Sequence, residues 1–150
     1  MSGLSRIKHL EKTLAIKGDY QSLRAMDMIK REMNAEKGFI RKGSGEDYYY
    51  HCIDVAQYIL NILPSIDNDT ITAALLHDIM EDVEGYTKEM LAELFNDNVA
   101  EIVDGLTKSP GVDYKTDHQA MAQYVDRIAN NASMSIVKTA DRVHNFRTLD

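Results

Sequence analysis

The chain has 150 residues, of which 44% are hydrophobic and 27% charged, so it is long enough for one globular domain over residues 1–150. Its net charge of −7 argues against binding along an extended nucleic acid, although a small anionic substrate is compatible where Lys, Arg or a metal offsets the repulsion. No apolar run is long enough for a membrane span or a secretory leader, and the single Cys52 cannot form an internal disulfide, so we expect a cytoplasmic protein.

Helical periodicity dominates from the start of the chain. A first helix is predicted over residues 4–17 and ends at Gly18. Asp19 is a suitable N-cap for a second helix, which stops near Gly38. A polar loop that contains glycine follows over residues 41–47.

The next helix is predicted from about Tyr49 to Leu63, where Pro64 ends it. Its apolar stripe includes Val55 and Tyr58, and His51 lies on the same stripe by helical spacing. We therefore expect His51 to point into the core.

A fourth helix is predicted from residues 68–70 to Gly85, and it concentrates ionisable groups on one side. At about 100° per residue, four of them fall within an arc of about 140° on an otherwise apolar helix. These residues are His77, Asp78, Glu81 and Asp82. Either the arc faces water, or it is buried and a bound cation compensates its carboxylates.

The remaining sequence predicts four more helices and no strand. They are expected over residues 87–95, 98–107 and 116–130, and from Met134, after a cap at residues 131–133, to about Leu149. The last of these helices carries Asp141 in a Lys-x-Ala-Asp-Arg-x-His-Asn string. Taken alone, Asp141 is either a structural ion-pair partner or a ligand. The fold class expected is all-α, as a single-domain orthogonal helical bundle.

Taken in order, the inward His51, the His77-Asp78 pair and Asp141 resemble the signature of the HD-domain metal phosphohydrolases. More closely, the chain resembles the hydrolase domain of the RelA/SpoT family and the small alarmone hydrolases, which remove the 3′-pyrophosphate from (p)ppGpp with manganese. The signature occupies about residues 38–150, and the Glu81-Asp82 pair points to this branch. The other resembling segments are Arg41-Lys42, Tyr48-Tyr49-Tyr50, Ala73-Ala74-Leu75-Leu76 and residues 137–145.

This resemblance implies an HD-type fold and a role for each matching residue. The implied metal ligands are His51, His77, Asp78 and Asp141. Glu81 and Asp82 are implied to be the catalytic pair that positions and deprotonates the attacking water. The implied substrate contacts are Arg41 on the purine, Lys42 on phosphate and Asn145 on the nucleotide. A mixed imidazole and carboxylate set suits Mn²⁺ or another divalent transition metal.

Two alternatives to (p)ppGpp hydrolysis stay open. The first is an HD phosphohydrolase of a deoxynucleotide, a nicotinamide nucleotide phosphate or a cyclic nucleotide, and the second is a non-catalytic nucleotide sensor stabilised by its metal. Glu81-Asp82 favours the alarmone hypothesis, because a structural metal has no use for additional buried carboxylates. The expected partner is a small-molecule nucleotide, and no binding to a membrane is expected.

Three further expectations concern residues around this signature. Relatives usually continue beyond the position of Asp150 with helices that close the pocket, so we expect a partner subunit in a homo-oligomer, or a more open pocket, in their place. His144, three residues after Asp141, is expected to support a ligand or the packing rather than to bind metal. Tyr48, Tyr49 and Tyr50 are expected to pack at the start of their helix.

Overall fold

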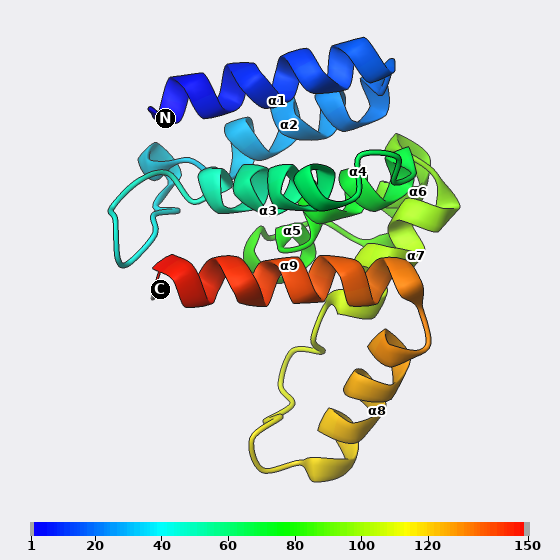
Figure 1. The fold of residues 1–150 in the computed structure, drawn as a ribbon. Coiled ribbons are helices and arrows are strands. Elements are labelled where there is room, and N and C mark those ends of the chain that lie inside the picture. Colours follow the sequence, from blue (N-terminus) through cyan, green and yellow to red (C-terminus); the bar gives the residue numbers. More distant parts are fainter. Residues whose placement is uncertain (1, 149–150) are drawn as a thin grey trace.

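The computed structural model describes residues 2–148, and within them its regular structure consists of helices joined by loops, with one isolated antiparallel bridge between Ile40 and Asp47 (Figure 1). The all-α class is therefore confirmed. The helices are α1 (Gly3–Lys17), α2 (Tyr20–Glu32), the 3₁₀ helix η1 (Ala35–Lys37), α3 (Tyr49–Ile62), α4 (Asn68–Leu76), α5 (Ile79–Asp82), α6 (Lys88–Leu94), α7 (Asp97–Leu106), α8 (His118–Ala129) and α9 (Ala132–Thr148).

The N-terminal hairpin of α1 and α2 forms as the sequence predicts. Gly18 adopts the left-handed conformation, with φ 74°, and its N–H bonds the last carbonyls of α1. The Asp19 side chain then accepts a hydrogen bond from the backbone N–H of Ser22 and so caps α2. However, α2 ends at Glu32, earlier than Gly38, because Asn34 bonds the carbonyl of Lys30 and caps η1 instead.

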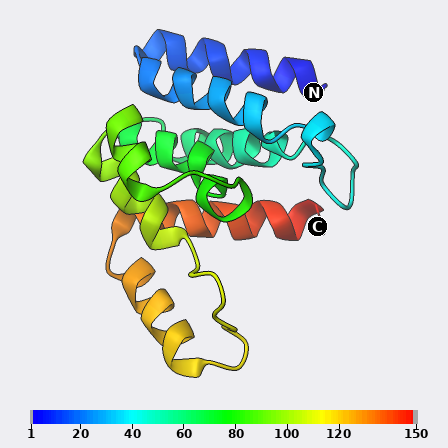
Figure 2. The same ribbon diagram turned by 180° about the vertical axis from the view of Figure 1, so that it is seen from behind.

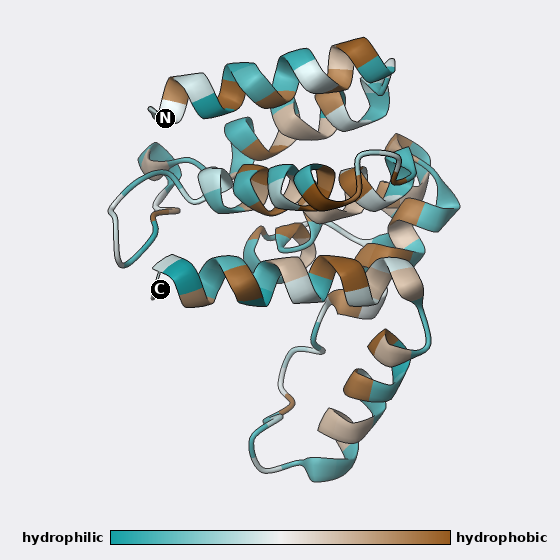
Figure 3. Cartoon of the chain, viewed as in Figure 1, coloured by the Kyte–Doolittle hydropathy of each residue, from teal (hydrophilic) through white to brown (hydrophobic). Residues whose placement is uncertain are grey.

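Helix α4 lies at the centre of the molecule and positions the functional site. It packs against α2, α3, α7 and α9, and its residues 70–76 are all buried. A helix that is apolar on all sides is stable only when neighbours cover it entirely. By contrast, hydrophobic and hydrophilic segments alternate along α1 and α9 in Figure 3, as expected for helices with one exposed side.

The prediction of one continuous helix from residues 68–70 to Gly85 was wrong. Helix α4 ends at Leu76, and α5 begins only at Ile79, so that His77 and Asp78 form the junction. The Nδ1–H of His77 donates to the carbonyl of Ala74 at 2.6 Å, and this is the acceptor that the backbone N–H of Asp78 uses in an unbroken helix. Side-chain competition for a backbone carbonyl thus accompanies the break.

Helices α3 and α9 run antiparallel, with α5 between them in both views (Figures 1 and 2). Helix α9 begins at Ala132, two residues before Met134, because the Asn131 side chain accepts from the Met134 N–H. Its expected end at Leu149, like Asp150, lies outside the described residues.

Helix α8 and the loop before it extend away from the other helices in both views (Figures 1 and 2). Within residues 2–148, no helix combines the length and the apolarity that crossing a bilayer would require.

Candidate metal centre

Four side chains from three separate parts of the chain meet between α3, the α4–α5 junction and α9. One potential ligand atom from each lies within 4.8 Å of the corresponding atoms of the other three. They are His51 on α3, His77 and Asp78 at the junction, and Asp141 on α9. This is the set that the family resemblance implies, assembled here from residues as far apart as 90 positions in the sequence.

Both imidazole rings present their Nε2 atoms to carboxylate oxygens. The Nε2 atoms of His51 and His77 lie 2.7 Å and 3.1 Å from the same Oδ1 atom of Asp141. The Nε2 atom of His77 is also 3.1 Å from Oδ2 of Asp78. The ligand atoms therefore converge on one point rather than pairing off separately.

Backbone and side-chain contacts orient these groups from outside the cluster. Because Nδ1–H of His77 bonds the carbonyl of Ala74, its Nε2 atom is the one turned to the carboxylates. The Tyr48 hydroxyl donates to Oδ2 of Asp78 at 2.8 Å. Tyr48 was expected only to pack at the start of its helix, although its place one helical turn before His51 was a usable signal for this contact.

The last helix holds Asp141 with two further donors. Lys138 Nζ lies 3.6 Å from Oδ2 of Asp141, and the Asn145 amide donates to its Oδ1 at 3.4 Å. Asn145, the predicted nucleotide contact, thus lies beside the cluster. The residues share one side of α9 by their i, i+3 and i, i+4 spacing.

Electrostatics in the cluster favours a positive charge at its centre. Burial by itself lowers the pKa of His77, but the charges of Asp78 and Asp141 outweigh it and raise that pKa well above its ordinary value. Burial likewise opposes ionisation of Asp141, yet its hydrogen bonds with His51 and His77 hold its pKa below the ordinary value. Burial lowers the pKa of His51, which favours its neutral, ligating form.

These residues fit a divalent transition metal. Two imidazole nitrogens and two carboxylates are a mixed donor set, which suits Mn²⁺ and neighbouring ions better than the hard, all-oxygen sites typical of calcium. The two carboxylates balance a divalent charge, and each histidine turns Nε2 inward. The donor chemistry is thus consistent with the ligand set expected from the resemblance.

Glu81 opens onto the cluster, whereas Asp82 lies beside it. Glu81 helps to line a cavity of about 80 Å³ together with His77, Asp78 and Asp141, and it accepts a hydrogen bond from the backbone N–H of Lys108 at 2.5 Å. Asp82 is not among the residues that line this cavity. Burial, and then the charges of Asp78 and Glu81, raise the pKa of Asp82 to about 7.

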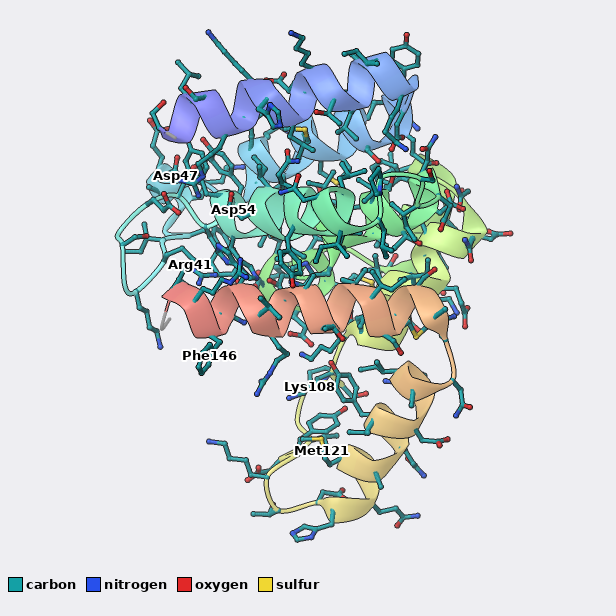
Figure 4. The ribbon with its side chains drawn as sticks, in the orientation of Figure 1. Arg41, Asp47, Asp54, Lys108, Met121 and Phe146 are labelled. Carbon is teal, nitrogen blue, oxygen red and sulfur yellow. The ribbon has the colours of Figure 1, made fainter. Side chains whose placement is uncertain are left out.

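Two lysines give the same cavity a cationic wall. Lys108 and Lys138 both line it, and their ammonium groups lie 5.4 Å and 5.9 Å from the ring centroid of Tyr124. Lys108 comes from the loop after α7, on the α8 side of α9 (Figure 4). Lys108 was not predictable from the sequence, because a single lysine in a loop carries no periodic signal.

The predicted Arg41-Lys42 pair is divided between interior and surface. Arg41 is buried near the C-terminal end of α9 (Figure 4), where it donates to Oγ1 of Thr148 at 2.6 Å. Its guanidinium lies 5.8 Å from the centroid of the Tyr48 ring, so it borders the residue that bonds Asp78. Lys42 is exposed in the loop. Of the two residues, Arg41 therefore adjoins the site, whereas Lys42 faces solvent.

A scan against protein families matches residues 25–150 to the HD domain model. Among curated proteins, the guanosine-3′,5′-bis(diphosphate) 3′-pyrophosphohydrolase of Haemophilus influenzae is 38% identical over 126 residues, covering 81% of this chain. A probable GTP pyrophosphokinase of Mycobacterium leprae is 37% identical over 108 residues, covering 71% of this chain. The chain spans only 18% and 13% of the length of these two relatives.

A solved structure, described as a metazoan ortholog of SpoT that hydrolyses ppGpp, matches with a TM-score of 0.70. Its sequence is 23% identical, and the match covers 86% of this chain and 70% of that one. At this identity the likeness shows the fold, and it confirms the HD-type helical bundle.

Proposed function

Because this chain belongs to the HD-domain family, we propose that it is a metal-dependent phosphohydrolase that removes the 3′-pyrophosphate from (p)ppGpp. The name of the Haemophilus influenzae relative supports this substrate and this bond. Other relatives are named as GTP pyrophosphokinases, and the chain spans a small part of each. The proposal therefore depends mainly on the chemistry of the site.

The observation that carries the proposal is the four-residue cluster beside a cavity with two lysines. His51, His77, Asp78 and Asp141 would hold the metal, for which we propose Mn²⁺. When bound, such an ion supplies Lewis acidity for the attack of water on phosphorus.

The residues of the cavity suit an anionic phosphate. Lys108 and Lys138 lie where their ammonium groups can bind phosphate oxygens and offset the charge of the surrounding carboxylates. Glu81 lines the same cavity, and we assign its carboxylate the role of accepting a proton from the attacking water, with Asp82 beside it. Water then forms a bond to the phosphorus on O3′ as the O3′–phosphorus bond breaks. The electron pair of that bond stays on O3′, which takes up a proton to become the 3′-hydroxyl of the nucleotide, and the water oxygen ends in the free pyrophosphate.

Substrate orientation is assigned to residues outside the lining of this cavity. Arg41, Lys42 and Asn145 stay predicted substrate contacts, and of these Asn145 bonds Asp141 while Arg41 adjoins Tyr48. A cytoplasmic location and a homo-oligomeric state likewise stay predictions.

A nucleotide panel tests the proposal. The protein is stripped of metal, reloaded with Mn²⁺, and incubated with ppGpp, pppGpp, a deoxynucleoside triphosphate, NADPH, a cyclic nucleotide, or GTP with ATP. Phosphate and pyrophosphate are measured separately, and His77→Ala serves as the inactive control. Release of pyrophosphate from ppGpp and pppGpp is expected. Cleavage of another nucleotide with (p)ppGpp left intact would replace the alarmone assignment by a broader HD phosphohydrolase.

A further inference from the structure

A chain of polar contacts leads from His51 away from the metal cluster. The Nδ1 atom of His51 lies 2.7 Å from the Nδ1 atom of His144 on α9. The other ring nitrogen of His144, Nε2, lies 3.2 Å from Oδ2 of Asp54 on α3. The order is therefore metal cluster, His51, His144 and Asp54.

An arginine from the first helix anchors the far end of this chain of contacts. The Arg6 guanidinium donates through Nε and Nη2 to the two carboxylate oxygens of Asp54 and through Nη1 to Glu46. Burial opposes ionisation of Asp54, yet the hydrogen bonds from His144 and Arg6 hold its pKa below the ordinary value. Asp54 is thus an ionised acceptor, on the side of α3 that faces α1 (Figure 4).

An ionised Asp54 dictates where the protons of the two histidines lie. A carboxylate only accepts, so the Nε2 atom of His144 must carry its proton towards Asp54. In the neutral ring the Nδ1 atom of His144 is then an acceptor, and the proton between the two rings belongs to Nδ1 of His51. This leaves the lone pair of His51 on Nε2, the atom that would bind a metal. Without a metal, the ionised Asp141, 2.7 Å from that Nε2 atom, is an acceptor that competes for the proton of His51, and a bound cation removes this competition.

The opposite arrangement does not allow metal binding. If His144 donated from Nδ1, the proton of His51 would lie on Nε2, and that atom would donate to Asp141 without a lone pair for a metal. The contacts of Asp54 therefore distinguish a metal-competent from a metal-incompetent form of His51.

We propose that His144 and Asp54, anchored by Arg6, are positioning residues that hold His51 in the tautomer able to bind a metal through Nε2. The proposal rests on the metal centre of the proposed function but not on its substrate. His77 reaches the same state differently, through the backbone carbonyl of Ala74. Arg6 lies before residue 25, where the match to the HD domain model begins, so the first helix of this chain supports the metal site.

The tautomers are directly measurable in the unmodified protein. Long-range ¹H–¹⁵N spectra of protein labelled in its five histidines distinguish a proton on Nδ1 from one on Nε2. With diamagnetic Zn²⁺ bound, the proton of His51 is expected on Nδ1 and that of His144 on Nε2, and His144→Asn identifies the two signals. A proton on Nδ1 of neutral His144, or His144 protonated on both nitrogens, overturns the proposal.

Two nearly isosteric variants separate positioning from packing. In His144→Asn the amide oxygen can still accept from Nδ1–H of His51, whereas His144→Leu offers no acceptor. We expect His144→Leu to weaken Mn²⁺ binding about 10- to 100-fold, with His144→Asn close to wild type. Equal losses of Mn²⁺ affinity in both variants, or no loss in either, would contradict the positioning role of His144.

A second pair of variants tests the carboxylate. Both Asp54 and Glu46 bind Arg6, but only Asp54 contacts His144. Asp54→Asn is therefore expected to weaken metal binding about tenfold, and Glu46→Gln much less. A wild-type protein that binds no Mn²⁺ or Zn²⁺ would overturn the proposed metal centre, and with it the positioning role of His144 and Asp54. If the wild type binds metal, and Asp54→Asn and Glu46→Gln have equal metal affinities, only the positioning role of His144 and Asp54 would be overturned.

Discussion

The Nε2 atom of His77 lies 3.1 Å from Oδ1 of Asp141, although 64 positions separate the two residues in the sequence. This contact joins the α4–α5 junction to α9. A metal ion that binds both side chains therefore also stabilises the packing of these two parts of the chain. Metal binding and folding stability should therefore be coupled in this protein.

His77→Ala and Asp141→Ala are expected to lose the metal, the hydrolase activity and part of the thermal stability together. Removing the metal from the wild type with a chelator should lower its melting temperature as well, because the ion binds only the folded chain. Elemental analysis and thermal melts measure these effects, with the exposed His118→Ala as control. Full metal occupancy in Asp141→Ala would show that Asp141 is not a ligand.

Glu81→Gln and Asp82→Asn are expected to separate metal binding from turnover. Each amide keeps the size of the side chain but removes its basicity, so turnover should fall roughly 100-fold while the metal content stays normal. In Glu81→Gln the amide oxygen can still accept from the N–H of Lys108, so the loop keeps its anchor. Near wild-type turnover in both variants would reduce the pair to a structural role.

The stability of the metal-free protein is expected to report the raised pKa of Asp82. Burial and its acidic neighbours raise this pKa from an ordinary 3.8 to about 7. Between these values the unfolded chain has released the proton and the folded chain still holds it, so the folded state loses stability as the pH rises. Asp82→Asn lacks this loss. Its free energy of unfolding relative to that of the wild type should therefore increase from about pH 4 to 7.

Urea unfolding in the presence of a chelator, at several pH values across this window, measures the difference in free energy of unfolding between Asp82→Asn and the wild type. The exposed Asp126→Asn on α8 serves as the matched control for the loss of one carboxylate at the surface. A difference between Asp82→Asn and wild type that is constant with pH would contradict the assigned environment of Asp82.

Arg41→Ala is expected to raise the Michaelis constant for (p)ppGpp about tenfold, equivalent to roughly 1.4 kcal/mol of lost binding, with a smaller change in turnover. Because Arg41 is buried against Tyr48 and Thr148, the melting temperature has to be followed in parallel. A chromogenic phosphodiester without a purine, and the exposed Lys37→Ala, are the controls. Equal slowing of both substrates in Arg41→Ala would mean that Arg41 acts through packing.

The sequence predicted most helices because their ends leave regular signals, and the family resemblance predicted that His51, His77, Asp78 and Asp141 lie together, whereas their role as metal ligands stays a prediction. Caps such as Asp19 and glycine at Gly18 mark helix ends, and helical spacing turned His51 towards the core. The HD-family signature then connected His51 with residues far along the chain. The break at His77 was not predictable in this way, because it accompanies a side chain that takes a carbonyl of its own helix.

Contacts that depend on tertiary structure could also not be predicted from the sequence. Lys108 reaches the cavity from an irregular loop, and the Tyr48 hydroxyl finds Asp78 only when the junction is formed. Asp54 looked like an ordinary polar position on α3, since its partners Arg6 and His144 lie on other helices. Such contacts follow from the packing of α1, α3 and α9, which periodicity does not specify.

The most direct test of the account is a titration of metal-free protein with Mn²⁺ while pyrophosphate release from ppGpp is followed. Activity should be absent without metal, rise in proportion to added Mn²⁺, and level off at about one equivalent per chain, with ³¹P spectra showing free pyrophosphate and a nucleotide that keeps its 5′-diphosphate. Release of pyrophosphate that is independent of metal, or ppGpp left intact by the fully loaded protein, would contradict it.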